Sequence, residues 1–312
     1  MSIIDMHTHF SVETSRFSED ADVIGYAVEN KSLGEHLDMM NELGISWSLL
    51  SCPTLKYLDQ RERCASYCRE VNDAASAVCV QHPDRFGFAA LLPLPHIADA
   101  LFELRRAAAL PGMHAVGLCS NYQGMYLGDP RLEPLFDLMD ELALTAVLHP
   151  AAPPVYPAAP VTGKVLPMFE FIVDTTRTML DLFASETLLR HPNIRLVIPH
   201  TGSCLPVAYD RFHGILRVQN RDVEVPMDQL YFDLACDAYP RAVPCLLNLT
   251  DTKHIVYGSD FPAIPLPVLR RHVEMTRNCP EFRDCLDDIL CNNAHELLCR
   301  NCSGDRHSSV CC

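Results

Sequence analysis

The chain of 312 residues carries 25 Lys and Arg residues against 40 Asp and Glu residues, a formal net charge of −15 at pH 7. This acidic balance excludes a surface that follows nucleic-acid phosphates, because such surfaces need clustered Lys and Arg. Hydrophobic residues make up 48% of the sequence and charged residues 21%, which excludes a disordered chain and provides material for a large core.

Membrane and secretory segments are not readable in the sequence. No apolar run reaches the ~20 residues that a membrane-spanning helix needs, and the opening MSIIDMHTHF has neither a basic nor a long apolar region. We therefore expect a cytoplasmic protein that binds no membrane and no nucleic acid and keeps its 15 cysteines reduced. Cys299 and Cys302 form a CxxC pair near Cys311 and Cys312, but such a pair supplies only two of the four ligands of a structural zinc site. We interpret these residues as ordinary buried or tail thiols.

Short β-rich runs alternate with amphipathic stretches along the chain, a pattern typical of βα units. The predicted strands are Ile3–His9, Ile45–Ser51, Phe86–Leu92, Ala115–Cys119, Thr145–His149, Arg195–His200, Leu230–Ala235 and His254–Asp260. The predicted helices are Leu33–Leu43, Arg61–Gln81, Ile97–Ala109, Leu132–Leu142, Phe169–Arg190, Leu205–Val218, Ala238–Leu249 and Pro267–Thr276. This order predicts an α/β fold, a single-domain (β/α)8 TIM barrel over residues 1–300, followed by a flexible Cys-containing tail over 301–312.

Two features of the loops bear on this prediction. A doubly wound sheet would place a glycine-rich turn after the first strand, and the sequence has His7-Thr8-His9-Phe10 there instead. The proline-rich segment Pro150–Pro167 follows the fifth strand without a hydrophobic period, so it is either a lid or a plain surface loop. We favour a lid, because the loops after barrel strands build the active site.

The histidines fall at the ends of predicted strands. His7 and His9 lie two apart on the first strand, so pleating turns both side chains to the same side. His149, His200 and Asp260 end the fifth, sixth and eighth strands, and all five side chains should converge at the C-terminal mouth of a barrel. Three imidazoles and a carboxylate suit Zn²⁺, with Mn²⁺ also possible, and leave a position for water or substrate. The alternative is that each histidine is an ordinary core residue, but burying these groups unpaired would cost several kcal/mol.

This order of residues resembles the amidohydrolase superfamily, in particular its decarboxylase-rich branch related to aminocarboxymuconate-semialdehyde decarboxylase. The resemblance runs from Ile3 to about Leu298. Three longer runs look most like the 6-methylsalicylate decarboxylase group: HPDRFGFAALLPLP (82–95), VGLCSNYQGMYLGDPRLEPLF (116–136) and FEFIVDTTRTMLDLFASETLLRHPNIRLVIPHTGS (169–203).

The resemblance implies a metal held by His7, His9, His149 and Asp260, with His200 beside the metal-bound water or the substrate. Cys119-Ser120-Asn121 stands where a metal-bridging Lys would follow the fourth strand, which favours one metal.

Further residues have less specific roles. Arg211 matches an arginine that in relatives binds the substrate carboxylate and can be supplied across a dimer interface, so we expect a homodimer; the alternative is an exposed helix residue. Many relatives carry His-Gly-Gly-Gly after the sixth strand, whereas this chain has residues 200–203 as His-Thr-Gly-Ser, so the identity of the substrate is less secure than the reaction type. Residues at the right end of the barrel to touch substrate are Ser51, Cys52, Asn121 and Tyr122.

The reaction implied by the resemblance is non-oxidative decarboxylation of a hydroxybenzoate-type aromatic acid, similar to 6-methylsalicylate, with release of CO2. Asp260 is the expected proton donor, His200 the hydrogen-bonding partner and Arg211 the carboxylate-binding residue. One alternative is that the same metal activates water, so that the enzyme hydrolyses a lactone or amide or hydrates a small carboxylate. A second alternative is a metal-binding protein without catalytic activity.

Overall fold

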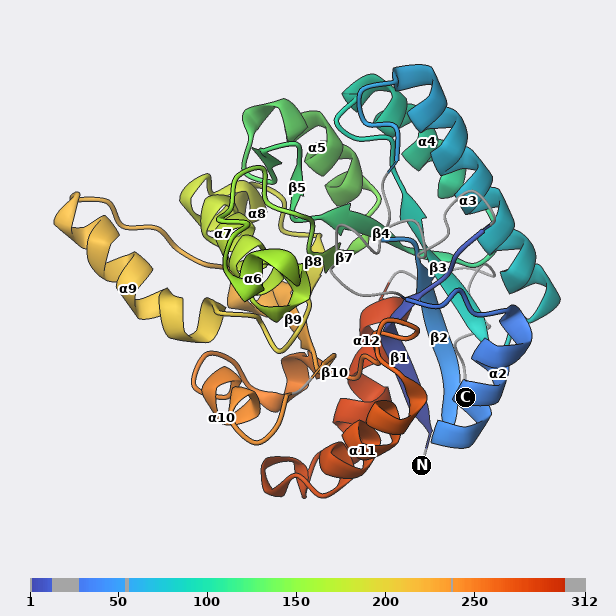
Figure 1. Cartoon of the computed structure of the whole chain (residues 1–312). Coiled ribbons are helices and arrows are strands. Elements are labelled where there is room, and N and C mark those ends of the chain that lie inside the picture. The colour runs from blue at the N-terminus through green and yellow to red at the C-terminus, as the bar shows by residue number, and fades with distance from the viewer. Residues whose placement is uncertain (1, 13–27, 54–55, 237, 301–312) are drawn as a thin grey trace.

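The computed structural model describes residues 2–12, 28–53, 56–236 and 238–300. The predicted tail over 301–312, with Cys302, lies outside the described residues. Eight parallel strands form one sheet whose order follows the chain (Figure 1). The strands are β1 Ile3–His9, β2 Ile45–Ser51, β3 Phe86–Leu91, β4 Met113–Cys119, β7 Thr145–His149, β8 Arg195–Ile198, β9 Leu230–Asp233 and β10 Ile255–Val256.

The sheet closes into a barrel between β1 and the segment after β10. The amide of Met6 donates to the carbonyl of Tyr257 at 2.9 Å, and the amide of His9 donates to the carbonyl of Phe261 at 2.7 Å. These bonds satisfy backbone groups that an open sheet edge would leave unpaired. The predicted (β/α)8 barrel is thereby confirmed.

Helices surround the barrel because each crossover between parallel strands packs its apolar face on the sheet. The helices are α2 Leu33–Leu43, α3 Arg61–Gln81, α4 Ile97–Ala107, α5 Glu133–Glu141, α6 Val161–Lys164, α7 Glu170–Ala184, α8 Thr187–Arg190, α9 Leu205–Val218, α10 Ala242–Leu246, α11 Leu266–Arg277 and α12 Asn293–Cys299. α2 shows how local sequence sets these bounds: Ser32 and Glu35 form a capping box at its start, and Gly44 ends it with φ +77°.

The interior of the barrel is a packed core of side chains from alternate strand positions. Ile4, Trp47, Val197 and Val256 contribute from four different strands, and α12 covers one end of this core with Ala294, Leu297 and Leu298. α12 thus covers the end of the barrel that carries the strand N-termini, and the polar side chains at the strand C-termini face the loops of the opposite end, where barrel active sites are built.

Several predicted elements differ from the structure at their ends. The predicted helix Phe169–Arg190 is two helices, α7 and α8, because Glu186 adopts a left-handed conformation with φ +56° between them. The predicted strands that end at His200 and Asp260 stop earlier, at Ile198 and Val256. In both cases the chain leaves the ladder to enter a left-handed turn that aims a polar side chain into the site.

Candidate metal centre

β1 places two histidines at the mouth of the barrel by changing its register. Its pairing with β2 shifts between Asp5 and Thr8, and Met6 belongs to the interior core while the next residue, His7, already faces the site. A bulge of this kind re-aims side chains next to functional sites. As a result His7 and His9 point toward the site, and Thr8 points outward, where its hydroxyl oxygen lies 3.3 Å from the Nε2 atom of a histidine on α2, His36.

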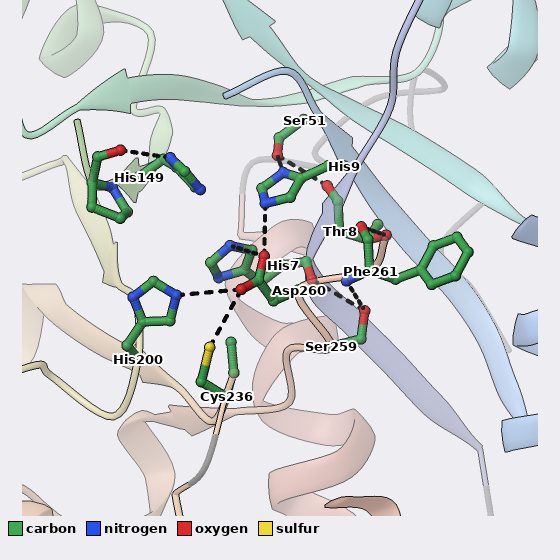
Figure 2. A network of polar contacts seen from close by, with 12 residues as sticks. His7, Thr8, His9, Ser51, His149, His200, Cys236, Ser259, Asp260 and Phe261 are labelled. Atoms are coloured by element: carbon green, nitrogen blue, oxygen red, sulfur yellow. Dashed lines mark hydrogen bonds and ion pairs between the residues drawn. The ribbon is translucent and has the colours of Figure 1, made fainter. Parts of the chain in front are cut away.

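The structure brings together the four residues that the resemblance assigns to a metal. His7, His9, His149 and Asp260 each offer one ligand atom, and these atoms all lie within 4.8 Å of one another. The Nε2 atom of His9 is 3.0 Å from Oδ1 of Asp260, and the Nε2 atom of His7 is 3.7 Å from the same oxygen. Tetrahedral ligands at ~2.0–2.1 Å from one ion would be about 3.4 Å apart, so the cluster has the dimensions of a metal site (Figure 2).

The tautomers of the three imidazoles favour metal binding. Nδ1 of His7 lies 2.8 Å from Oδ2 of Asp233, and Nδ1 of His149 lies 2.8 Å from the carbonyl of Pro150. Both acceptors require a proton on Nδ1 and leave the lone pair on Nε2. Within the described residues, Nε2 of His7 has no hydrogen-bond partner although it is buried. A buried lone pair of this kind fits a cation.

Ser51 fixes the tautomer of His9 in the same way. Its hydroxyl donates to the carbonyl of Thr8 at 2.9 Å and can therefore accept a proton from Nδ1 of His9 at 3.0 Å. Nε2 of His9 then faces Oδ1 of Asp260 with lone pair against lone pair, a repulsive contact unless a cation or a proton lies between them. Ser51, which the sequence placed near substrate, thus orients a candidate ligand.

Burial and neighbouring charges shift the pKa values of the candidate ligands. Burial lowers the pKa of His149 well below its ordinary value, and it also lowers the pKa of His9 despite the hydrogen bond and charge of Asp260. Burial alone would raise the pKa of Asp260, but the polar contacts of His200 and His9 with its oxygens and the charge of His7 outweigh it and hold that pKa well below the ordinary range. Neutral imidazoles and an ionised carboxylate are the forms that bind a metal.

His200 stands beside this cluster in a left-handed turn. Four consecutive residues, His200 to Ser203, have φ values of +58°, +57°, +75° and +58°. The turn aims Nε2 of His200 at Oδ2 of Asp260, 3.6 Å away. Burial lowers the pKa of His200, but the hydrogen bond and charge of Asp260 and the charge of Asp233 outweigh it, so the net shift is upward. The pKa of His200 is raised, whereas those of the candidate ligands His9 and His149 are lowered, so His200 is protonated more readily than they are.

Asp233 contacts two histidines of the site, and the sequence analysis did not single it out. Besides accepting from His7, its carboxylate accepts the amide of His200 at 2.9 Å through Oδ1, so one side chain orients both histidines. The available signal was a carboxylate within the otherwise mostly apolar predicted strand Leu230–Ala235. Gly258 supports the same arrangement, because a Cβ atom there would lie 2.8 Å from Cβ of His7 and 3.2 Å from Cβ of Asp233.

Other predicted site residues have different surroundings. The Asn121 amide donates to Asp174 and to the Ala152 carbonyl. Tyr122 is buried, and its hydroxyl accepts from the amide of Cys119 at 2.9 Å. A cavity of about 20 Å³ beside His7 and His149 is partly lined by Cys52 and Cys119 and has room for one water-sized molecule.

Arg211 is not part of the cluster. It lies on α9, where its side chain is exposed, and α9 extends away from the barrel (Figure 1). Val207, Ile215 and Val218 share this helix and are 71%, 51% and 78% exposed. Spacings of four and seven residues put them on the same helix face as Arg211.

Known proteins are similar to this chain in sequence and in architecture. A family model described as amidohydrolase matches residues 4–299. The 6-methylsalicylic acid decarboxylase of Aspergillus aculeatus is 29% identical, over 95% of this chain and 96% of the relative. A crystal structure of an amidohydrolase II has a TM-score of 0.87 at 28% identity, covering 95% of this chain and 99% of its own. A dihydroxybenzoic acid decarboxylase from Polaromonas, solved with manganese and 2-nitroresorcinol, has a TM-score of 0.83 at 18% identity, over 96% of this chain and 97% of its own.

Proposed function

The chain belongs to the amidohydrolase family, and from this premise we propose that it is a metal-dependent carboxy-lyase that removes CO2, without oxidation, from a hydroxybenzoate-type acid similar to 6-methylsalicylate. One observation carries the proposal: three buried imidazoles and a carboxylate face a common point in a chain that aligns over nearly its whole length with a 6-methylsalicylic acid decarboxylase.

We assign His7, His9, His149 and Asp260 as ligands of one divalent ion, Zn²⁺ or Mn²⁺. Imidazole and carboxylate donors suit both ions. When bound, such an ion would supply a Lewis acid for an anionic aromatic substrate.

Decarboxylation requires a proton at the ring carbon that carries the carboxylate. Once this carbon is protonated, the ring can accept the electron pair of the breaking C–C bond, and loss of CO2 restores aromaticity with that proton in its place. Asp260 relays the proton to this carbon. It is protonated only transiently, because its depressed pKa keeps it ionised at rest. His200, 3.6 Å away and with a raised pKa, resupplies it.

Arg211 contributes from a second copy of the chain. Its exposed position on α9, away from the cluster of its own chain, supports a role across a homodimer interface. The exposed apolar side chains of Val207, Ile215 and Val218 beside it would be covered by the partner. In that position its guanidinium binds the substrate carboxylate by a charge-assisted hydrogen bond.

Residues 1–300 form the catalytic unit of this proposal, and the 301–312 tail has no part in it. A cytoplasmic location is supported by Cys64, Cys79 and Cys119, which are buried as free thiols, the state that a reducing compartment maintains. Within the described residues, no helix is both long and apolar enough to cross a membrane.

A substrate panel tests the proposed reaction. Metal-loaded protein is incubated with hydroxybenzoates that differ in ring substituents, and released CO2 is measured while lactone and amide hydrolysis are followed in parallel. We expect CO2 release from an acid with a hydroxyl group next to the carboxylate, and none from the metal-free protein. Hydrolysis of a lactone or amide with no CO2 release from any acid would establish the hydrolase alternative instead.

A further inference from the structure

A buried carboxylate outside the metal cluster collects four hydrogen bonds. Asp174 of α7 has no exposed surface. Its Oδ1 accepts from the Tyr126 hydroxyl at 2.7 Å and from Nη1 of Arg177 at 2.8 Å. Its Oδ2 accepts from the Ser120 hydroxyl at 2.5 Å and from Nδ2 of Asn121 at 2.7 Å. Both oxygens thus accept two hydrogen bonds, and the side chain joins α7 to the end of β4 and to the hairpin of β5 (Asn121–Tyr122) and β6 (Met125–Tyr126).

The Oδ2 side of this network reaches the segment that carries His149. The Ser120 hydroxyl, which donates to Asp174, accepts the amide of Ala151 at 2.8 Å. The backbone amide of Ser120 donates to the carbonyl of His149 at 2.9 Å. Ser120 therefore holds the chain on both sides of the peptide that includes the Pro150 carbonyl, the acceptor for Nδ1 of His149.

Asn121 adds a second connection to the same segment. One hydrogen of its Nδ2 goes to Asp174 and the other to the carbonyl of Ala152 at 3.1 Å, while its Oδ1 accepts the amide of Gly124 at 3.1 Å. Every polar group of this amide is engaged. The two residues that Asp174 orients, Ser120 and Asn121, thereby fix the backbone at His149, Ala151 and Ala152, on both sides of Pro150.

We propose that Asp174 is a positioning residue of the metal centre: through Ser120 and Asn121 it holds the segment 150–152 so that Nε2 of His149 stays aimed at Nε2 of His7 and His9. This inference rests on the proposed metal centre but not on the identity of the reaction. It assigns a role to a buried charge that neither binds the metal nor touches a substrate.

The physical reason is that each oxygen of Asp174 accepts two donors, whereas an amide side chain has only one oxygen, so two of the four donors would lose their acceptor. In Asp174→Asn one oxygen becomes an NH₂ group, which turns two more donors toward groups that are already donating. The Ser120 hydroxyl would then lose its acceptor or change its orientation and release the amide of Ala151. Groups that orient metal ligands in this way typically contribute 10- to 100-fold to metal affinity.

The test measures metal binding directly. Full-length Asp174→Asn and wild-type protein are stripped of metal and titrated with Mn²⁺, and the absorption bands of the Co²⁺ form are recorded as a signature of ligand geometry. We expect Mn²⁺ affinity to fall by about 10- to 100-fold and the Co²⁺ bands to change. Ser120→Ala, which removes the link but leaves three donors on Asp174, should reproduce both effects.

Two variants serve as matched controls. Tyr126→Phe removes a donor from Oδ1 and leaves the Ser120 and Asn121 contacts in place, so its metal affinity should stay within about twofold of wild type. Glu103→Gln changes another buried carboxylate, 3% exposed, that accepts from Asn72 and Arg106 away from the site. It should lower thermal stability without a change in the Co²⁺ bands.

The outcomes separate this inference from the proposed reaction. Wild-type affinity and wild-type Co²⁺ bands in Asp174→Asn would overturn the positioning role even if the enzyme releases CO2. A wild-type protein that binds metal tightly but decarboxylates nothing would leave the positioning role intact and contradict the reaction. Equal loss of metal affinity in Asp174→Asn and Glu103→Gln would show a general loss of folding and contradict the inference. Wild-type protein that binds no metal would contradict both.

Discussion

At Gly258 a single hydrogen atom stands where any other residue would carry a Cβ. A Cβ atom at this position would lie 2.8 Å from Cβ of His7 and 3.2 Å from Cβ of Asp233. Gly258→Ala must therefore displace His7, a candidate metal ligand, and Asp233, which accepts the Nδ1 proton of His7. We expect a loss of ~1–3 kcal/mol in the free energy of unfolding from overpacking and about tenfold weaker metal binding.

Gly214→Ala is the matched control for this change. Gly214 lies within α9 and its Cβ would meet nothing within 4 Å. Replacement by Ala should leave metal affinity unchanged and stabilise the helix by ~0.5–1 kcal/mol. Chemical denaturation of both variants measures the free energy of unfolding, and metal titration measures the affinity. Equal metal affinity in Gly258→Ala and wild type would show that the position of His7 does not depend on the close contact with Gly258.

The pKa shifts of the candidate ligands predict how metal binding depends on pH. The pKa of His7 is raised: burial lowers it, but the charge and hydrogen bond of Asp233 and the charge of Asp260 outweigh burial. His7 therefore binds a proton up to and above the ordinary histidine pKa of about 6.5, and a metal must displace it. His9 and His149 have lowered pKa values, because burial disfavours their charged forms, so a second proton competes with a metal for them less than it does for His7.

We therefore expect metal affinity to fall as pH decreases through the pKa of His7. The sign follows from competition: protons occupy the metal-free ligand at low pH, so binding releases them. Calorimetric titration near pH 6 in buffers of different ionisation enthalpy counts the released protons, and we expect about one, from His7, while His200 keeps the proton that its raised pKa favours. Release of three or more protons would show that all the histidines titrate as ordinary side chains.

At the scale of elements, the left-handed turn over residues 200–203 aims His200 at the site and places three residues other than glycine in a strained backbone conformation. A residue other than glycine in this conformation costs ~1–2 kcal/mol, and Ser203 adopts it with only a 3.3 Å hydrogen bond from its hydroxyl to the carbonyl of Pro199. Ser203→Gly should raise the free energy of unfolding by ~0.5–1 kcal/mol after the entropy cost of glycine.

Gly202→Ala should have the opposite effect in the same turn. Its φ is +75°, and its Cβ would lie 3.1 Å from the ring of Phe232, so we expect a loss of more than ~1 kcal/mol. Urea unfolding compares the two variants with wild type. If Ser203→Gly is less stable than wild type, the turn is held by the serine side chain and is not strained.

Much of the barrel and the cluster could be predicted because strand ends position the residues. β1, β2 and β7 have the predicted bounds, and His7, His9 and His149 lie at their ends or within two residues of them, where periodicity is informative. The left-handed turns at His200 and Asp260 could not be predicted, because positive φ at these residues follows from packing and not from propensity.

Contacts between segments that are distant in the chain could not be predicted from the sequence either. Asp233 orients His7 across 226 positions of the chain, and Asp174 accepts from Ser120 across 54. The β5–β6 hairpin has two residues per strand, too few to produce a period. α12 follows a π-helical segment, Asp288–Asn292, that interrupts the helical pattern before it.

At the scale of the whole molecule, the exposed position of Arg211 predicts complementation between inactive chains. Arg211→Ala lacks the carboxylate-binding residue and His7→Ala lacks a metal ligand. In a hybrid dimer with shared sites, one of the two sites holds both intact residues, so activity should return when the two variants are mixed. Size-exclusion chromatography first establishes whether the wild type is a dimer. A monomer at assay concentration, or a mixture that stays inactive, would show that Arg211 does not act across an interface.

The central claim is that a metal held by His7, His9, His149 and Asp260 supports loss of CO2 with protonation of the ring. The most direct measurement is the reaction in D₂O with an active hydroxybenzoate, followed by NMR and mass spectrometry of the product. The metal-loaded wild type and a His36→Asn control, altered at a buried histidine outside the cluster, should both yield one deuterium at the carbon that lost the carboxylate. His7→Ala should bind no metal and yield no product. Product formation by metal-free His7→Ala at the wild-type rate, or CO2 release without deuterium at that carbon, would contradict the account.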